Sequence, residues 1–483
     1  MNIRKESQAK IIATIGPASR SEEMLTKLAQ AGVDVFRLNL SHDVHETHAE
    51  AIKNIKTVRE KTGKNLVILG DLQGPKLRVG VMKNNGVNLE NGQNFILTAN
   101  ECEGDETRAY MNYIELPKSV TPGEIVLIDD GKIKLEVIST NGKDEVVTKV
   151  INGGILGSRK GVNLPNTRLN LPCLTEKDLN DLQFAIGQGI DWIGLSFVRR
   201  DTDIIELRKQ IHERKSNLKI IAKIEKPEAL EYLDKIIEAT DGVMVARGDL
   251  GVEVSFEKVP LIQKEIVTKC ISASKPVIIA TQMMESMITN FSPTRAEAND
   301  VANAVLDGAD AMMLSAETSV GNFPVEAVLA MQRIITWTEQ QMPEFRLHPP
   351  IEEARGHGFL TKAICYNAAS LAKQVEASAI IIFAQDDTSV RLVASHRAIH
   401  AKIMVYTTKS ELLHTLPLFW GVEAHLYPEF NTIADAVTYA KQHVLEDKLL
   451  KEGSKVVYLG SVPFALNRPN MVRLGRMEIN RND

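Results

Sequence analysis

Residues 241–254 read DGVMVARGDLGVEV, a short apolar run that ends abruptly on Arg247, Gly248 and Asp249. A run of this length, rich in β-branched residues and without strict polar alternation, is typical of a parallel strand covered on both faces. The glycine and the carboxylate at its end raise the question of what they do there. The answer depends on how often the pattern recurs along the chain.

The pattern recurs in eight places along the 483-residue chain. The eight runs are KIIATIG from Lys10, DVFRLNLSH from Asp34, NLVILGDLQG from Asn65, DWIGLSFV from Asp191, KIIAKIE from Lys219, GVMVARGD from Gly242, PVIIATQM from Pro276 and AMMLSAET from Ala311. Amphipathic segments typical of helices accompany them at residues 21–31, 47–61, 202–215, 228–239, 257–274, 294–306 and 324–341. Eight strands alternating with helices predict a (β/α)8 TIM barrel, with an open doubly wound sheet as the alternative.

Polar side chains gather at the carboxyl ends of these runs. A single aspartate after a strand is usually a turn or helix cap. A whole ring of charged and hydroxyl side chains would cost several kcal/mol to bury without partners or a ligand, which favours an active site at one face of the barrel. The residues concerned are Arg37, Asn39, Ser41, Asp71, Ser196, Lys223, Glu225, Arg247, Asp249, Thr281, Gln282, Ser315 and Glu317.

Two further regions differ from the barrel pattern. Residues 72–171 hold short β-like runs separated by Gly-containing turn pairs, which predicts a small β-barrel domain inserted into the TIM barrel and placed to act as a lid. A Pro-Pro linker then leads to alternating helices and strands, which predicts a C-terminal three-layer α/β domain. The expected divisions are 1–71 and 172–345 for the barrel, 72–171 for the insert and 346–483 for the C-terminal domain.

The composition excludes several classes of protein. With 44% hydrophobic residues, 25% charged residues and a net charge of -5, the chain has no basic field for nucleic acid or anionic lipid. Its apolar runs are shorter than the ~18 residues of a membrane span, and the N-terminal run is too short for a signal peptide. Four widely spaced cysteines without metal spacing suit a reducing cytoplasm. We therefore expect a cytoplasmic protein without nucleic-acid or membrane partners.

Two carboxylates at adjacent strand ends, Glu225 and Asp249, suit Mg²⁺ or Mn²⁺, with a substrate supplying further oxygens. Lys223 precedes Glu225 by two residues, so both side chains lie on one face of the strand. An ammonium beside a divalent metal can stabilise charge on a transferring phosphoryl group or an enolate oxygen. Structural pairing of the carboxylates with Arg or Lys, including a plain Lys223–Glu225 salt bridge, remains the alternative.

Three other side chains are candidates for substrate binding. Arg37 and Arg78 can hold phosphates with their planar forks, or they can be surface arginines. Thr281 can position a proton or a substrate carboxylate, although an isolated threonine at a strand end is more often a cap.

Many segments, in order, resemble pyruvate kinase. They are KIIATIGPASRS, RLNLSH, DLQGPKLRVG, KGVNLP, AKIEKPEAL, GVMVARGDLGVEV, ATQMMESM and PTRAEANDVANAVLDGADAMMLSAET. The resemblance covers the barrel and parts of the insert, and it is weak in the C-terminal third, which keeps the expected α/β alternation. It implies phosphoryl transfer from phosphoenolpyruvate to ADP, giving pyruvate and ATP, and a homotetrameric assembly.

The resemblance also implies residue roles. Lys223 would stabilise the transition state and the enolate, and Glu225 with Asp249 would hold the essential Mg²⁺. The backbone around Gly248, together with Asp249 and Thr281, would bind the carboxylate of phosphoenolpyruvate.

Arg37 would contact the transferring phosphoryl group. The nucleotide phosphates would be reached by Arg78 and Lys160 from the insert, with Asn39 and His42 nearby. Positioning and electrostatics do most of the work in phosphoryl transfer, which suits this residue set.

The first departure from the family is Lys76, where members that require K⁺ usually carry Glu. The monovalent-cation ligands Asn39, Ser41, Asp71 and the Leu72 carbonyl still match the family. An ammonium at position 76 can replace the missing charge, so activity without K⁺ is expected.

The second departure lies in FAQDDTSVRLVAS, where the family's effector loop is rich in Ser, Thr and Gly. Asp386 and Asp387 would repel a phosphate there, which argues against fructose bisphosphate as an activator while leaving another phosphorylated effector open.

Two other functions compete with this reading. One is a lyase or aldolase on the same barrel, in which Lys223 forms a Schiff base. The other is a catalytically inactive sugar-phosphate sensor, which would be expected to have lost Lys223, Glu225 or Asp249; all three are present.

Overall fold

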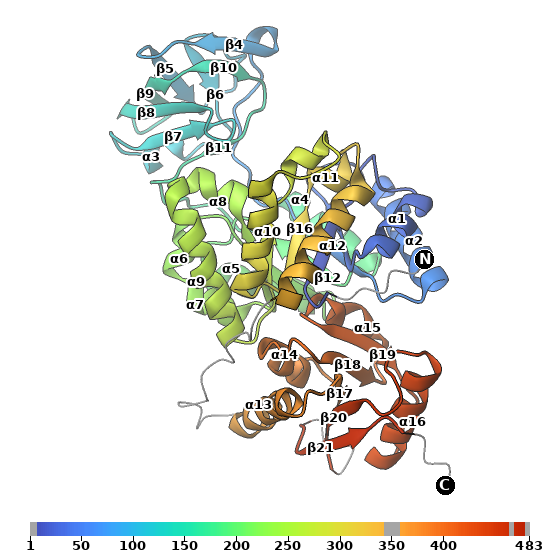
Figure 1. Cartoon of the computed structure of the whole chain (residues 1–483). Helices are drawn as coiled ribbons and strands as arrows, with labels where there is room; N and C mark the ends of the chain where they lie inside the picture. Colours follow the sequence, from blue (N-terminus) through green and yellow to red (C-terminus); the bar gives the residue numbers. More distant parts are fainter. Residues whose placement is uncertain (1–6, 342–357, 463–467, 479–483) are drawn as a thin grey trace.

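Eight parallel strands close into a barrel at the centre of the computed structural model, which describes residues 7–341, 358–462 and 468–478 (Figure 1). Each strand pairs with its neighbours in chain order, and the last pairs with the first. All eight predicted strands are confirmed, and closure excludes the open sheet. The strands are β1 (Lys10–Thr14), β2 (Val35–Asn39), β3 (Val67–Asp71), β12 (Trp192–Leu195), β13 (Lys219–Ile224), β14 (Gly242–Ala246), β15 (Val277–Ala280) and β16 (Ala311–Leu314).

Helices surround the barrel because their apolar stripes pack on the outer faces of nearly fully buried strands. The predicted helix 228–239 is broken at Tyr232 into two pieces, and three helices were not expected, namely α4, α8 and α11. The barrel helices are α1 (Glu22–Ala31), α2 (His45–Thr62), α4 (Glu176–Gly187), α5 (Asp201–Glu213), α6 (Pro227–Glu231), α7 (Leu233–Ala239), α8 (Arg247–Glu253), α9 (Val259–Ser272), α10 (Arg295–Asp307), α11 (Ala316–Ser319) and α12 (Pro324–Gln341).

The inserted domain stands at one end of the barrel and has its own hydrophobic core (Figure 1). A six-stranded sheet curls so that Arg78 pairs with Gly161 beside one edge and Val79 with Met111 beside the other. These two bridges join the edges, as expected for a small β-barrel. Its elements are β4 (Gly86–Leu89), β5 (Asn94–Thr98), β6 (Arg108–Tyr110), α3 (Leu116–Ser119), β7 (Ile125–Ile128), β8 (Ile133–Thr140), β9 (Glu145–Asn152), β10 (Gly154–Gly157) and β11 (Val162–Asn163).

The C-terminal domain is a five-stranded sheet with helices on both faces, in the order β19-β18-β17-β20-β21. Alternate residues of β17 explain the layers, because Ile380 and Ile382 belong to one apolar cluster and Ala379 and Ile381 to another. The predicted three-layer domain is confirmed. Its elements are α13 (Phe359–Gln374), β17 (Ala379–Phe383), α14 (Thr388–Ser395), β18 (Lys402–Thr407), α15 (Ser410–Thr415), β19 (Val422–Leu426), α16 (Ile433–Glu446), β20 (Lys455–Gly460) and β21 (Met471–Arg476).

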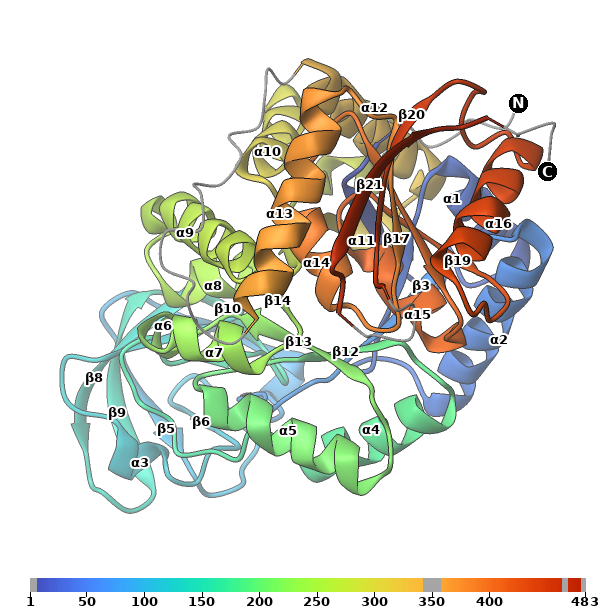
Figure 2. The same ribbon diagram turned by 90° about the horizontal axis from the view of Figure 1, so that it is seen from below.

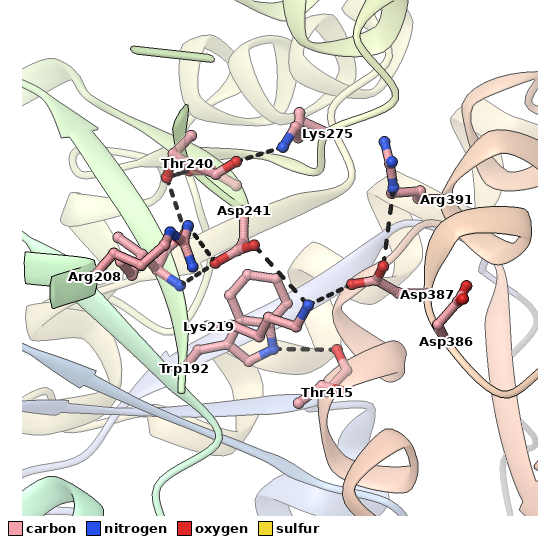
Figure 3. A network of polar contacts seen from close by, with 12 residues as sticks. Trp192, Arg208, Lys219, Thr240, Asp241, Lys275, Asp386, Asp387, Arg391 and Thr415 are labelled. Carbon is pink, nitrogen blue, oxygen red and sulfur yellow. Dashed lines mark hydrogen bonds and ion pairs between the residues drawn. The ribbon is translucent and has the colours of Figure 1, made fainter. Parts of the chain in front are cut away.

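The C-terminal domain docks on the barrel end opposite the inserted domain (Figures 1 and 2). The contacts fall where barrel strands begin: the Lys219 ammonium lies 2.6 Å from an Asp387 carboxylate oxygen, and the Trp192 indole N–H donates to the Thr415 carbonyl at 3.1 Å (Figure 3). Arg397 reaches back to Asp310, just before β16, at 2.8 Å with both side chains buried. The two ends of the barrel therefore face different domains.

The described residues include no helix that is both long enough and apolar enough to cross a membrane. The exact domain divisions at 71/72 and 171/172 stay predictions, although strands β4 to β11 fall between them. The division at 345/346 lies outside the described residues.

Asp310 offers a test of the docking surface. Its carboxylate accepts hydrogen bonds from Arg397, from the Val277 N–H and from the Trp420 N–H. Asp310→Ala leaves the buried Arg397 cation uncompensated, so the free energy of unfolding in urea should fall by about 3 kcal/mol. Asp234→Ala, which removes an exposed partner of Lys269, is the control and should cost less than about 1 kcal/mol. Equal and small losses of unfolding free energy in the two variants would contradict a stabilising role for the buried Asp310–Arg397 pair.

Candidate active site at the barrel mouth

A buried ion network at the carboxyl ends of the strands forms the centre of the site. One Asp71 carboxylate oxygen accepts from Arg37 Nε at 2.9 Å and from Arg37 Nη2 at 2.5 Å. The other lies 3.2 Å from Lys223 Nζ, which also lies 2.9 Å from Glu225 Oε1 and donates to Ser196 Oγ at 2.7 Å. These strand ends therefore converge as the sequence predicted, and Arg37 is not a surface arginine.

Small and polar neighbours make room for this network. A Cβ on Gly194 would lie only 3.0 Å from Asp71 Oδ1, so the strand next to β3 needs a glycine there. Thr14, at the end of β1, accepts from Arg37 Nη1 at 3.2 Å. Sequence reasoning missed both positions, although Thr14 is a polar strand end like those it did identify.

The charges in the network determine one another's protonation. Burial alone would lower the pKa of Lys223, but Asp71 and Glu225 outweigh it and raise that pKa above its usual value. Burial tends to raise the pKa of Asp71, yet Lys223 and Arg37 hold it below the usual range. Asp71 and Glu225 therefore favour the ammonium form of Lys223, whereas a Schiff-base lysine must give up its proton to act as a nucleophile.

Glu225 and Asp249 are the candidate metal ligands. Burial is the main cause that raises the pKa of Glu225; Lys223 opposes it and the nearby charge of Asp249 adds to it. A divalent cation would relieve this repulsion, and carboxylate oxygens are the donors that Mg²⁺ and Mn²⁺ prefer, so the residues fit such an ion. Among the described residues no three His, Cys, Asp or Glu side chains form a metal-binding group.

Helix α8 carries Gly248 and Asp249 in its first turn, whereas the sequence placed them at the carboxyl end of the strand run. The Gly248 N–H donates to Thr281 Oγ1 at 2.7 Å, and a Cβ on Gly248 would come within 3.1 Å of that oxygen. Asp249 lies exposed beside them at the mouth. The glycine is needed for this close approach, and the threonine does act as a cap for the helix start.

Backbone strain marks the same region. Thr281 has φ of 69° and Phe197 has φ of 60°, both in the left-handed region that non-glycine residues seldom adopt. Arg247 stabilises the first of these turns by donating to the Thr281 carbonyl at 2.9 Å while pairing with Asp300 at 2.6 Å. The Phe197 N–H donates to Glu225 Oε2 at 3.1 Å, so the second turn holds a candidate metal ligand. Such strain is common at functional sites.

The predicted nucleotide residues belong to two domains, the barrel and the insert. Partial burial and then the positive charges of Lys76, Arg78 and Arg37 lower the pKa of His42, so these cations lie near it. Arg78 also donates to the Arg159 carbonyl at 2.8 Å, while Lys160 pairs with Asp129 at 3.0 Å within the insert. Both side chains are therefore held by contacts within the insert.

Three of the four candidate monovalent-cation residues lie close together. Asn39 and Asp71 are register partners on β2 and β3, and Asn39 Oδ1 accepts from the Ser41 N–H at 3.2 Å. The Leu72 carbonyl accepts from Ser196 Oγ at 2.7 Å.

The charge of Lys76 interacts with those of the candidate metal ligands. Burial and then Lys223 lower its pKa, while Asp249 and Glu225 act to raise it. Its ammonium makes no hydrogen bond or ion pair with any side chain in the part of the chain that is described.

The acidic pair in the C-terminal domain has a different environment from the one expected. Asp387 pairs with Lys219 of the barrel and lies 4.0 Å from Arg391, so its charge is largely compensated (Figure 3). The Asp386 carboxylate accepts from the Thr388 N–H at 2.9 Å. Repulsion of a phosphate by this pair is therefore weaker than the bare sequence predicts.

Comparisons with known proteins agree with this geometry. The model of the pyruvate kinase barrel domain matches residues 6–328, and that of the pyruvate kinase alpha/beta domain matches residues 362–474. The chain is 42% identical to pyruvate kinase from Geobacillus stearothermophilus, covering 94% of this chain and 78% of that one, and 40% identical to that from Bacillus licheniformis, covering 97% and 80%. A crystal structure of a pyruvate kinase from Cryptosporidium parvum matches with a TM-score of 0.92 at 34% identity, over 98% of this chain and 97% of that one. The chain belongs to the pyruvate kinase family and is a phosphotransferase acting on phosphoenolpyruvate and ADP.

Proposed function

We propose that the Arg37–Asp71–Lys223–Glu225 network is the place where this pyruvate kinase transfers the phosphoryl group. The observation that carries the proposal is the Lys223 ammonium, buried among Asp71, Glu225 and Ser196 at 2.7–3.2 Å. A fixed ammonium stabilises negative charge that develops on the phosphoryl oxygens and on the enolate oxygen. Arg37, whose side chain is 11% exposed, presents its remaining guanidinium edge to the phosphoryl group.

The three-carbon substrate is bound, in this proposal, at the first turn of α8. Thr281 and the backbone at Gly248 receive its carboxylate, with Asp249 alongside. Glu225 and Asp249 hold Mg²⁺ or Mn²⁺, which when bound supplies charge neutralisation and orientation for the phosphate oxygens. Two side chains of the protein position the reacting groups: Lys223 holds the enolate oxygen and Arg37 orients the phosphoryl group.

ADP or ATP lies, we infer, between the barrel mouth and the inserted domain. The positive charge of Arg78 contributes to lowering the pKa of His42, which supports phosphate binding by Arg78 together with Asn39 and His42. Lys160 can reach the phosphates only by exchanging its ion pair with Asp129 for one with the nucleotide. The inserted domain would act as a lid that excludes water from the transfer.

Assembly, regulation and location are further proposals. A homotetramer is supported by family membership and by large apolar side chains exposed on the barrel, among them Phe256, Leu261, Phe291 and Trp337. A phosphorylated effector other than fructose bisphosphate at the C-terminal domain fits the compensated charge of Asp387. The four cysteines are free, which suits a reducing cytoplasm.

Lys223→Met tests the central role. Loss of the ammonium should lower kcat for ADP-dependent pyruvate formation at least about 10²-fold, because one preorganised charge has been removed from the transition state. Lys209→Met, at an exposed position on α5, is the control and should retain full activity. The assay is the coupled measurement of pyruvate from phosphoenolpyruvate, ADP and Mg²⁺. Undiminished turnover in Lys223→Met would contradict the assignment.

Gly248→Ala tests the substrate-binding turn. The added methyl group lies within 3.1 Å of Thr281 Oγ1, so the helix start must shift and the KM for phosphoenolpyruvate should rise about tenfold or more. Gly251→Ala in the same helix meets Val259 only at 3.8 Å and should leave KM unchanged. A KM for Gly248→Ala equal to that of the native chain would exclude this turn from the site.

Lys76 provides the test of cation dependence. We infer that its ammonium supplies the charge that K⁺ gives other members, since it lies near Glu225 and Asp249 without a carboxylate of its own. Turnover of the native chain should therefore be equal, within about twofold, in K⁺ and in Tris buffers, whereas Lys76→Glu should become K⁺-dependent because a carboxylate attracts the ion. Strong K⁺ activation of the native chain would refute the inference.

A further inference from the structure

A single buried carboxylate joins the inserted domain to helix α8. Glu253, the last residue of α8, accepts from Asn163 Nδ2 at 2.6 Å through Oε1. Asn163 is the last residue of β11, the strand after which the chain returns to the barrel. The Glu253 side chain is only 1% exposed, so this contact between domains is shielded from water.

The same carboxylate oxygen of Glu253 is paired with the ammonium of Lys226. Lys226 directly follows Glu225, and its ammonium lies 4.6 Å from the centre of the Phe197 ring. Since the Phe197 N–H donates to Glu225, the contacts from Glu253 lead back to a candidate metal ligand. The inserted domain is thus connected to the candidate metal ligand through four consecutive contacts.

The energetics favour a positioning role over a purely stabilising one. Both members of the Lys226–Glu253 pair are at most 8% exposed, and a buried pair gains little net stability over apolar residues of similar size. Glu253 Oε2 is itself buried without a hydrogen bond, so the carboxylate is held by its other oxygen alone. The Lys226–Glu253 pair is costly to bury but fixed in direction, so it is suited to holding the Glu253 carboxylate in one position.

The length of α8 makes a relay possible. Asp249 and Glu253 are four residues apart, a rise of about 6 Å, and belong to one short helix, so a displacement of Glu253 reaches Asp249 over about one turn. A second part of the inserted domain lies beside the same helix, because a Cβ on Gly131 would meet Val252 at 3.8 Å. A shift of the inserted domain that carries Glu253 with it must therefore also move Gly248 and Asp249.

We propose that Asn163 and Glu253 are positioning residues: the seating of the inserted domain on the barrel is transmitted through Glu253 and α8 to the substrate-binding turn at Gly248 and Asp249. Lys226 holds the Glu253 carboxylate in place. The inference rests on the proposed role of that turn. It adds a physical reason why movement of the inserted domain should affect the binding of phosphoenolpyruvate.

A second contact between residues 72–171 and the barrel provides a matched control. Arg168 lies 3.3 Å from Glu231 on α6, but the two side chains are 71% and 55% exposed, and α6 carries no proposed ligand. Both pairs bridge the same two parts of the molecule. Only the Asn163–Glu253 pair ends on the helix that carries the substrate-binding turn.

The experiment compares Asn163→Ala, Glu253→Gln and Arg168→Ala in the full-length enzyme. Hydrogen exchange of the peptide covering residues 247–253 reports on α8 without any substrate, and steady-state kinetics report KM for phosphoenolpyruvate and kcat. Asn163→Ala and Glu253→Gln should speed exchange in α8 and raise that KM about tenfold or more. Their double variant should cost less than the sum of the two, because they share one interaction. Arg168→Ala should match the native chain in both measurements.

The two readouts separate the relay from the function on which it rests. Unchanged α8 exchange in Asn163→Ala would overturn the relay. Faster α8 exchange with an unchanged KM would support the relay and contradict the assignment of Gly248 and Asp249 to the substrate. Equal effects of Asn163→Ala and Arg168→Ala would overturn the specific role of α8, since general loosening of the inserted domain would then explain both.

Discussion

The Asp71 carboxylate, held between Arg37 and Lys223, is the interaction on which the rest of the site depends. Its two oxygens are shared between the two cations, which keeps it ionised although it is 1% exposed. Without Asp71, two buried cations would repel each other across the barrel mouth. With it, both are kept charged and aimed at the same space, which phosphoryl transfer requires. The glycine at 194 is the consequence of making room for that carboxylate.

The barrel makes this network possible through its geometry. Parallel strands in chain order bring their carboxyl ends to one face, so residues far apart in sequence become neighbours without long loops. The covering helices take up the apolar outer faces, and the polar residues of the network lie towards the carboxyl ends of their strands. Strained turns at Phe197 and Thr281 then aim backbone groups into the same space.

Local patterns explain which features the sequence could predict. The eight strands were predictable because apolar runs recur and stop on polar residues, and Lys223 with Glu225 was predictable from two-residue spacing. Helix α8 was not, because seven residues with two glycines give no helical signal.

Pairings over long sequence distances were not predictable either. Asn163 and Glu253 are 90 residues apart, and neither has a local pattern that marks a partner. Asp387 is a similar case, because its charge could be judged only after Lys219 of the barrel was placed beside it.

The location of the C-terminal domain at the starts of the strands has a consequence for how such an enzyme can diversify. The ion network and the contacts with the C-terminal domain lie at opposite ends of the barrel, so the length of the strands separates them. Single strands nevertheless connect the two ends: in β13, Lys219 contacts the C-terminal domain and Lys223 belongs to the ion network, about 13 Å apart along one extended backbone. Substitutions where the C-terminal domain docks should therefore be most constrained in strands, such as β13, that carry a network residue at their other end.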